Sequence, residues 1–151
     1  TSRGKWYDIS WKGDESKSGG IATNIGIHFF DMLAWLFGGV QENLVHLREK
    51  DKSAGYLEFE KARVRWYLSI DENSLPTNIR EIGQRTYRSI TINGEELEFS
   101  TGFTELHTKS YFQILKGEGF GLVDAKESIK IAQKIRNNTI ITLGEKHPFC
   151  S

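Results

Sequence analysis

The chain has 151 residues, of which 38% are hydrophobic and 26% charged, which suits one globular domain with a real core and excludes a disordered chain. Lys+Arg and Asp+Glu both number 20, so the formal net charge is zero. We therefore expect no nucleic-acid binder, because such proteins usually carry a basic excess. Cys150 is the single cysteine, which excludes an internal disulfide and a cysteine-based zinc site and fits a reducing compartment.

The start of the chain and its longest apolar stretch bear on membrane association and on whether the domain belongs to a longer protein. The stretch from Phe29 to Phe37 contains Asp31 and is too short to span a bilayer. No signal segment opens the chain, which begins at Thr1 without a Met. We therefore expect residues 1–151 to be one domain cut from a longer cytoplasmic protein that does not associate with membranes.

The first third of the chain predicts an extended segment, a loop and one long helix. Residues 3–11 are dense in aromatic and charged side chains and predict a short strand or an extended loop. The polar, glycine-containing residues 12–20 predict a loop. Residues 21–37 have helical length, and Gly38-Gly39 directly after them is a helix-ending signal.

The apolar period changes to two in the middle of the chain. The pattern predicts strands at residues 40–48, 54–60, 62–71, 86–92 and 95–99. Within the third of these, apolar residues such as Trp66 alternate with polar residues such as Arg65, as in a strand with one buried face. The last two strands flank Asn93-Gly94, a strong hairpin signal.

Two helices are predicted after the strands, from Thr104 or Glu105 to Lys116 and over residues 124–137. Asp124 and Glu127 have the spacing of a capping box. This order predicts an α+β fold, with one open, mainly antiparallel β-sheet and helices packed on one face. The other face of the sheet is semi-polar and is expected to be a subunit contact; it carries Glu58, Arg63, Arg65 and Tyr67.

The helix predicted over residues 21–37 carries one polar stripe. At about 100° per residue, Asn24, His28, Asp31 and Trp35 share one narrow edge, and apolar residues cover the rest. A helix that is apolar nearly all round is expected to be buried. Its polar side chains must then be hydrogen-bonded, since each would otherwise cost roughly 1–3 kcal/mol.

Two interpretations of this stripe stay open. In the first, Asp31 orients His28 within a structural network, and the pair by itself favours this interpretation. In the second, the stripe is the wall of a ligand cleft. Gly19, Gly20 and Gly26 remove side chains beside it, as expected where a ligand or another backbone comes close. The lysines and serines of the preceding loop suit an anionic ligand, although a solvated polar turn explains them equally well.

The chemistry of a cleft with this histidine is proton transfer. The unperturbed pKa of a histidine lies near neutrality, so His28 could take the proton of a sugar hydroxyl while hydride leaves the same carbon.

The same residues resemble a known family. The run GGIATNIGIHFFD at residues 19–31 resembles the Gly-Gly…Asp-x-Gly-x-His-x-x-Asp signature in the C-terminal domain of the Gfo/Idh/MocA oxidoreductases. Four further segments are similar to the branch that oxidises UDP-N-acetylglucosaminuronic acid at the sugar 3-hydroxyl, so the likeness runs over nearly the whole chain. These are SRGKWY at 2–7, SWKGD at 10–14 with Lys17-Ser18, LHT…Y at 106–111 and GEGFG…DA at 117–125.

The resemblance implies a fold and a cofactor. The family's second domain is an open antiparallel sheet with helices, of the glyceraldehyde-3-phosphate-dehydrogenase-like type, and members assemble as dimers or tetramers through the sheet face. NAD or NADP binds mainly to an N-terminal Rossmann domain, which also supplies a catalytic Lys in a Glu-Lys-Pro motif. Neither is present in this chain. The only partial nucleotide fingerprint, Gly117-x-Gly119-x-Gly121, joins two helices and therefore predicts a helix end and turn.

The resemblance also implies residue roles. His28 is implied as the active-site histidine, and Asn24 stands where many relatives have Asp, so its amide can only form hydrogen bonds. The candidates for holding the sugar, its carboxylate or the pyrophosphate, for each of which a structural or surface role is equally open, are Arg3, Lys5, Trp6, Tyr7, Ser10, Lys12, Lys17, Asn24, Asp31 and His107. Tyr111, one turn after His107, is expected to pack. No metal ligands and no cofactor-binding residues are predicted.

Three functions follow, from two classes. The first is the substrate-binding half of an NAD-dependent nucleotide-sugar dehydrogenase in surface polysaccharide (lipopolysaccharide) biosynthesis, inactive as this piece alone. The second is a member of the same family that acts on another polyol or amino sugar. The third is a binding or assembly module without catalysis. A Rossmann fingerprint upstream would favour the enzymes, and a natural start codon directly before Thr1 would favour the module.

Overall fold

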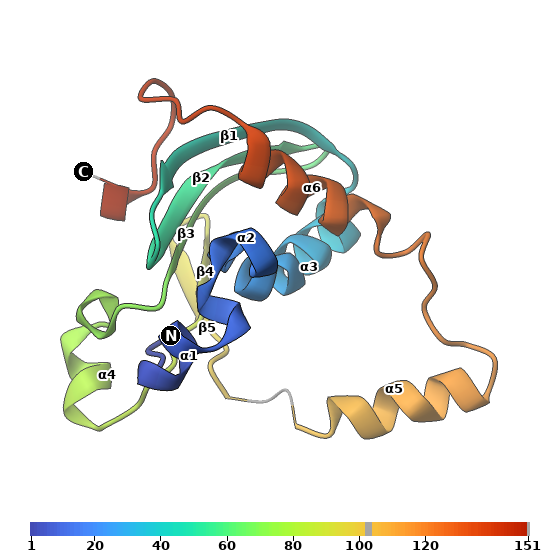
Figure 1. Ribbon diagram of the computed structural model, residues 1–151. Helices are drawn as coiled ribbons and strands as arrows, with labels where there is room; N and C mark the ends of the chain where they lie inside the picture. Colours follow the sequence, from blue (N-terminus) through green and yellow to red (C-terminus); the bar gives the residue numbers. More distant parts are fainter. Residues whose placement is uncertain (102–103, 151) are drawn as a thin grey trace.

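The computed structural model describes residues 1–101 and 104–150, and its strands form two antiparallel sheets (Figure 1). The first sheet has the order β1-β2-β3, with β1 at Val40–Arg48, β2 at Lys52–Phe59 and β3 at Arg63–Ser69. The second is a hairpin of β4 (Ser89–Ile92) and β5 (Glu95–Glu98). Asn93 and Gly94 join its strands with φ angles of 52° and 89°, as the sequence signal predicts.

Helices precede, connect and follow these strands. The long helices are α3 (Ile27–Phe37), α5 (Leu106–Leu115) and α6 (Lys126–Asn137). Before α3 lie α1 (Lys5–Ile9), the 3-10 turn η1 (Trp11–Gly13), α2 (Glu15–Ser18) and a π-helical turn η2 (Ala22–Gly26). The remaining short elements are η3 (Glu72–Ser74), α4 (Thr77–Glu81) and η4 (Pro148–Cys150).

The core lies between the three-stranded sheet and the helices α3 and α6, which cover one face of it (Figure 1). Phe30 of α3 is 1% exposed, and its ring meets Trp66 of β3 edge-on at 5.3 Å between centroids. Ile131 and Ile135 close the core from α6. Burying each such side chain stabilises the fold by roughly 1.5–3 kcal/mol. These contacts hold α3, and therefore the polar stripe, at a fixed place on the sheet.

The α+β class and the placement of helices on one sheet face are confirmed, with corrections. Residues 3–11 are not a strand, because Lys5–Ile9 forms a helical turn, and residues 12–20 contain two further short helices rather than a loop. The strands form two sheets rather than one. The capping box does not form, because the Asp124 carboxylate accepts a hydrogen bond from the N–H of Gly121, 2.7 Å away, and Ala125 occupies the N-cap of α6 without a side-chain hydrogen bond.

Helix α5 stands apart from the rest of the chain (Figure 1). Every residue from 104 to 124 is exposed, including Phe112 at 56%, Leu115 at 87% and Phe120 at 87%. The expectation that Tyr111 packs is wrong, since its side chain is 67% exposed. This segment, residues 104–124, therefore carries apolar surface that the described residues do not cover. An isolated helix of this length is also only marginally stable in water without packing partners.

The outer face of the three-stranded sheet is partly covered by the end of the chain. His147 stacks on Tyr67 with ring centroids 5.6 Å apart, and Phe149 meets Tyr67 edge-on at 5.3 Å. Arg63 and Arg65 remain exposed there. The predicted semi-polar character of this face is confirmed, whereas its role as a subunit contact stays a prediction.

One helical run of the described residues, Glu15–Phe37, is long and apolar enough to cross a membrane by length and composition alone. It is longer than the apolar stretch 29–37 because the short helices before α3 continue into it. Gly19 and Gly20, both with φ near 78°, break its regular helical path. Since Phe30 and Leu33 of this run lie in the core, we interpret it as the core helix of this fold.

Candidate functional site

The predicted polar stripe begins on a π-helical turn rather than on regular α-helix. Asn24 lies in the middle of this turn, and His28 follows four residues later on α3. Single π-turns are rare within helices and occur often at functional sites. Gly26 ends the turn with a structural role, because a Cβ there would lie 2.7 Å from Phe30 Cε2 and 2.8 Å from Leu68 Cδ1. Gly26 thus lets the helix approach the sheet, rather than making room for a ligand.

Gly19 and Gly20 turn the chain from α2 into the π-turn. Their φ angles of 77° and 78° lie in the left-handed region, which residues with a Cβ rarely adopt. A Cβ on Gly19 would also lie 2.6 Å from Thr23 Oγ1. Both glycines therefore serve the chain reversal that brings the segment before them onto the start of the long helix.

The N-terminal segment, residues 5–20, is folded on itself through local contacts. The Ser10 hydroxyl donates to the Tyr7 carbonyl at 2.8 Å and accepts from the N–H of Lys12 at 3.3 Å, so Ser10 has a structural role as a helix cap. A Cβ on Gly13 would lie 2.5 Å from the Tyr7 carbonyl oxygen and 2.8 Å from Asp8 Cα. Only a glycine allows η1 to pack this closely on α1.

Tyr7 and Asn24 join this segment to the stripe. The Tyr7 side chain is 4% exposed, and its hydroxyl accepts from Asn24 Nδ2 at 3.5 Å. Asn24 Nδ2 also donates to the backbone carbonyls of Lys12 at 3.3 Å and Gly20 at 3.2 Å. Burial raises the pKa of the Tyr7 phenol, so its hydroxyl stays protonated at neutral pH.

The rest of the stripe is open to solvent. His28 and Asp31 are exposed, and the Trp35 side chain is 83% exposed. The expectation of a helix buried all round is therefore wrong for this edge, because α3 packs only its opposite side, through Phe30 and Leu33, into the core. Within residues 1–101 and 104–150, neither His28 nor Asp31 forms a hydrogen bond or ion pair, so the structural-network interpretation of this pair is not supported.

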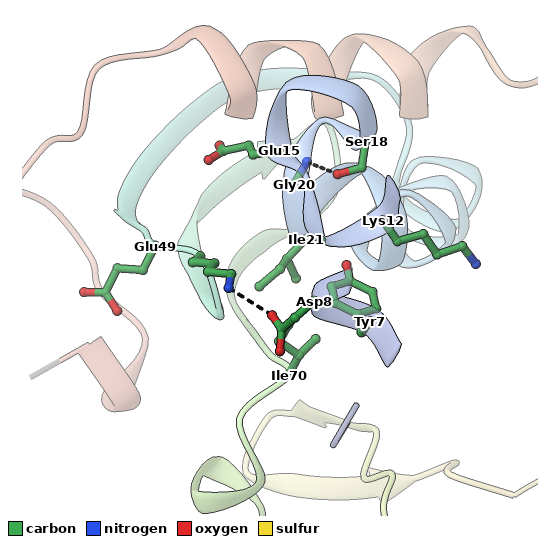
Figure 2. A pocket seen from close by; sticks show the side chains of 11 residues that line it. Tyr7, Asp8, Lys12, Glu15, Ser18, Gly20, Ile21, Glu49 and Ile70 are labelled. Carbon is green, nitrogen blue, oxygen red and sulfur yellow. Dashed lines mark hydrogen bonds and ion pairs between the residues drawn. The ribbon is translucent and has the colours of Figure 1, made fainter. Parts of the chain in front are cut away.

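A shallow hollow of about 320 Å³, counted with space open to solvent, lies on another side of Tyr7 (Figure 2). An ion pair between Lys50 Nζ and Asp8 Oδ1, 3.0 Å apart, spans part of it. Lys12 is also a lining residue, but its side chain extends away from the hollow in Figure 2. Neither Asn24 nor His28 lines it. Its lining residues are Tyr7, Asp8, Lys12, Gly13, Glu15, Ser18, Gly20, Ile21, Glu49, Lys50 and Ile70.

The other predicted site residues lie on exposed surface. Arg3, Lys5, Trp6, Lys12 and Lys17 are exposed along the N-terminal segment. Lys17 Nζ is paired with Asp14 Oδ2 at 3.1 Å, and Lys12 Nζ lies 5.8 Å from the centroid of the Trp11 ring. His107 is exposed on α5, which Figure 1 shows apart from α3. The structure thus brings Tyr7, Lys12 and Asn24 together one turn before His28, and it keeps His107 apart from them.

The glycine triplet at residues 117–121 and the clustering of His, Cys, Asp and Glu side chains bear on nucleotide and metal binding. Gly117, with φ 79°, ends α5 by donating its N–H to the Ile114 carbonyl at 3.0 Å. The triplet Gly117, Gly119 and Gly121 therefore forms a helix end and turn, as predicted, and it does not precede a helix N-terminus in a strand-turn-helix unit. Within residues 1–101 and 104–150 no group of three or more His, Cys, Asp or Glu side chains could hold a metal ion.

Sequence reasoning missed part of this arrangement. Glu49 and Lys50, in the turn between β1 and β2, line the hollow beside Tyr7. No local sequence pattern predicts a contact between residues so far apart in the chain. Gly13 was grouped with a polar loop, although its close approach to α1 is what shapes the segment.

Comparison with known families shows the class of protein to which this fold belongs. Residues 1–144 match the family model described as "Oxidoreductase family, C-terminal alpha/beta domain". The chain therefore belongs to the Gfo/Idh/MocA oxidoreductase family, through its C-terminal domain.

Among solved structures, the chain is similar to the WlbA (WbpB) dehydrogenase from Thermus thermophilus. In the complex of that protein with NAD and alpha-ketoglutarate, the identity is 57% and the TM-score 0.93, over 99% of this chain and 49% of that chain. In its complex with NAD and UDP-GlcNAcA, the identity is 56% and the TM-score 0.93, over 99% of this chain and 48% of that chain. The chain thus spans about half the length of these relatives.

Proposed function

We propose that this chain is the substrate-binding half of an NAD-dependent dehydrogenase that oxidises the 3-hydroxyl of UDP-N-acetylglucosaminuronic acid (UDP-GlcNAcA) in surface polysaccharide biosynthesis. The observation that carries the proposal is the uncovered polar edge of α3, on which His28 is exposed and has no partner among the described residues. The 56% identity with a dehydrogenase solved together with NAD and UDP-GlcNAcA supports the choice of substrate.

The proposed reaction needs a base beside the sugar hydroxyl. NAD, which we propose binds mainly to an N-terminal half outside this chain, would supply the hydride acceptor when bound. His28 takes the hydroxyl proton, because its imidazole is exposed on an edge that a ligand can reach and a neutral imidazole nitrogen can accept a proton. Asn24, one turn before it, has an amide that cannot take a proton at neutral pH.

The substrate is an anion, with a sugar carboxylate and a pyrophosphate, so it needs positive partners. Lys5 and Lys12 are exposed on the segment that Asn24 holds on the start of α3, and Arg3 is exposed just before it. Lys17 is already paired with Asp14, so we expect it to contribute less. Exposed lysine and arginine side chains of this kind suit phosphate and carboxylate groups.

Steady-state assays on the full-length protein test this proposal. NADH formation with UDP-GlcNAcA is measured for the wild type, His28→Ala and the control Asn78→Ala, which changes an exposed residue on α4. We expect His28→Ala to lower kcat by about 10²–10⁴-fold while the Kd for NAD stays unchanged, because it removes only proton transfer. Wild-type turnover by the His28→Ala variant would remove His28 from the mechanism.

The alternatives predict different outcomes of the same assay. A family member that acts on another polyol or amino sugar would reduce NAD with that substrate and not with UDP-GlcNAcA. A binding or assembly module would reduce NAD with neither. We further propose that the full protein is cytoplasmic and forms a dimer or tetramer through the outer face of the sheet, where Arg63 and Arg65 are exposed.

A further inference from the structure

The Asn24 amide has an orientation that its neighbours dictate. Its Nδ2 lies 3.3 Å from the Lys12 carbonyl and 3.2 Å from the Gly20 carbonyl, and carbonyl oxygens can only accept. The reversed amide would place oxygen against two oxygens. The NH₂ group therefore faces these carbonyls, and its two hydrogens are shared among three acceptors, of which the Tyr7 hydroxyl, at 3.5 Å, is the most distant.

Two of the three acceptors belong to short elements that precede the helical run of Asn24. Tyr7 lies on α1 and Lys12 in η1, whereas Gly20 stands at the start of the helical run itself, one turn before Asn24. The elements α1 and η1 have five residues or fewer, so neither is stable as an isolated helix. The Asn24 side chain thus holds α1 and η1 on the start of this run, and it can do so only with hydrogens to donate.

A carboxylate at residue 24 could only accept hydrogen bonds at neutral pH, whereas the amide donates them. It has the same shape as the amide but no hydrogen, so its oxygens would face the Lys12 and Gly20 carbonyls without a hydrogen bond. The two carbonyls would then lose the donor that joins them to residue 24. The contacts with the Lys12 and Gly20 carbonyls therefore favour an amide over a carboxylate at residue 24.

We propose that Asn24 is a positioning residue: its amide holds the N-terminal segment, residues 5–20, on the start of α3 and so determines where Tyr7 and Lys12 lie relative to His28. Asn24 acts through these residues rather than as an acid or base. The holding of the segment follows from the contacts alone, whereas its effect on catalysis rests on the proposed function.

The first test uses the 151-residue chain and does not depend on the function. Amide hydrogen exchange of residues 5–20 is compared for the wild type, Asn24→Asp, Asn24→Ala and the control Asn78→Asp, an exposed amide on α4. We expect exchange in this segment to be about tenfold faster in both Asn24 variants at neutral pH, because the segment loses its donor, and unchanged in the control.

Acidification distinguishes donation from packing. After correction for the intrinsic pH dependence of exchange, Asn24→Asp should regain protection at acidic pH, where the protonated carboxyl donates one hydrogen, and Asn24→Ala should not. The titratable groups around this position are Tyr7, Lys12, Glu15 and His28. They are the same in both variants, so the difference between the variants reports residue 24. Wild-type protection in Asn24→Asp at neutral pH would overturn the proposal.

The second test uses the full-length protein and separates binding from chemistry. Asn24→Asp should raise the KM for the nucleotide sugar about tenfold and change kcat and the KM for NAD by less than about threefold, because it misplaces binding groups and leaves His28 intact. A fall in kcat with an unchanged KM would contradict a positioning role. If the wild-type protein oxidises no nucleotide sugar, the proposed function fails, while the exchange experiment still decides whether Asn24 holds the segment.

Discussion

Replacing Gly13 by Ala should separate η1 from α1 inside the N-terminal segment and leave the core unchanged. The new Cβ would lie 2.5 Å from the Tyr7 carbonyl oxygen and 2.8 Å from Asp8 Cα. These are backbone atoms that no rotamer change can move away, so η1 and α1 must separate. Overpacking of this kind costs about 1–3 kcal/mol, and the reduced freedom of the unfolded chain offsets about 0.4–1 kcal/mol of it. We expect a net loss of about 1–2 kcal/mol, confined to this segment.

Hydrogen exchange and denaturant unfolding measure this effect together. Amides of residues 5–20 should exchange about tenfold faster in Gly13→Ala, whereas the m-value of global unfolding should stay unchanged, because Gly13 lies outside the core cluster. Gly4→Ala is the matched control, since Gly4 has φ −77° and its Cβ would meet only the Trp6 side chain, at 3.3 Å. Wild-type exchange in Gly13→Ala, or an equal effect of Gly4→Ala, would refute the reasoning.

Three further predictions concern the core, the outer sheet face and the cofactor. Phe30→Ala should lower the free energy of unfolding by about 3–5 kcal/mol in denaturant titrations, because Phe30 is 1% exposed against Trp66; a loss below about 1 kcal/mol would contradict the core assignment. Burial and then the charge of Arg65 lower the pKa of His147 below its usual value of 6.5, so the folded chain keeps this imidazole neutral where the unfolded chain takes up a proton. The unfolding free energy should therefore fall as the pH drops through that value, and His147→Gln should show a smaller fall in the same titration. The 151-residue chain should bind no NAD in calorimetry, and a micromolar Kd would contradict the proposal that the cofactor binds mainly outside residues 1–151.

Elements with a long or distinctive pattern could be predicted from the sequence. Strand β3 followed from the alternation around Trp66, and the hairpin followed from Asn93-Gly94, because in both cases neighbouring residues decide the structure. The helix α1 could not be predicted, since five residues are too few to show a period. Its conformation depends on the contact of Tyr7 with Asn24, seventeen residues away in sequence.

The candidate site was predictable to a similar extent. The helical wheel placed Asn24, His28 and Trp35 on one edge, and the structure confirms that they belong to one helical run. Local composition could not show that this edge is exposed, because an apolar helix is buried only as far as other elements cover it. The hollow beside Tyr7 could not be predicted from the sequence either, since Glu49 and Lys50 meet the N-terminal segment only in the folded chain.

Modification of histidines by diethyl pyrocarbonate, read residue by residue by mass spectrometry, tests most directly whether the α3 edge binds substrate. The measurement compares the NAD-loaded full-length protein with and without saturating UDP-GlcNAcA. Our account predicts that the nucleotide sugar slows the modification of His28 at least about tenfold. Equal modification of His28 with and without the bound sugar would contradict it.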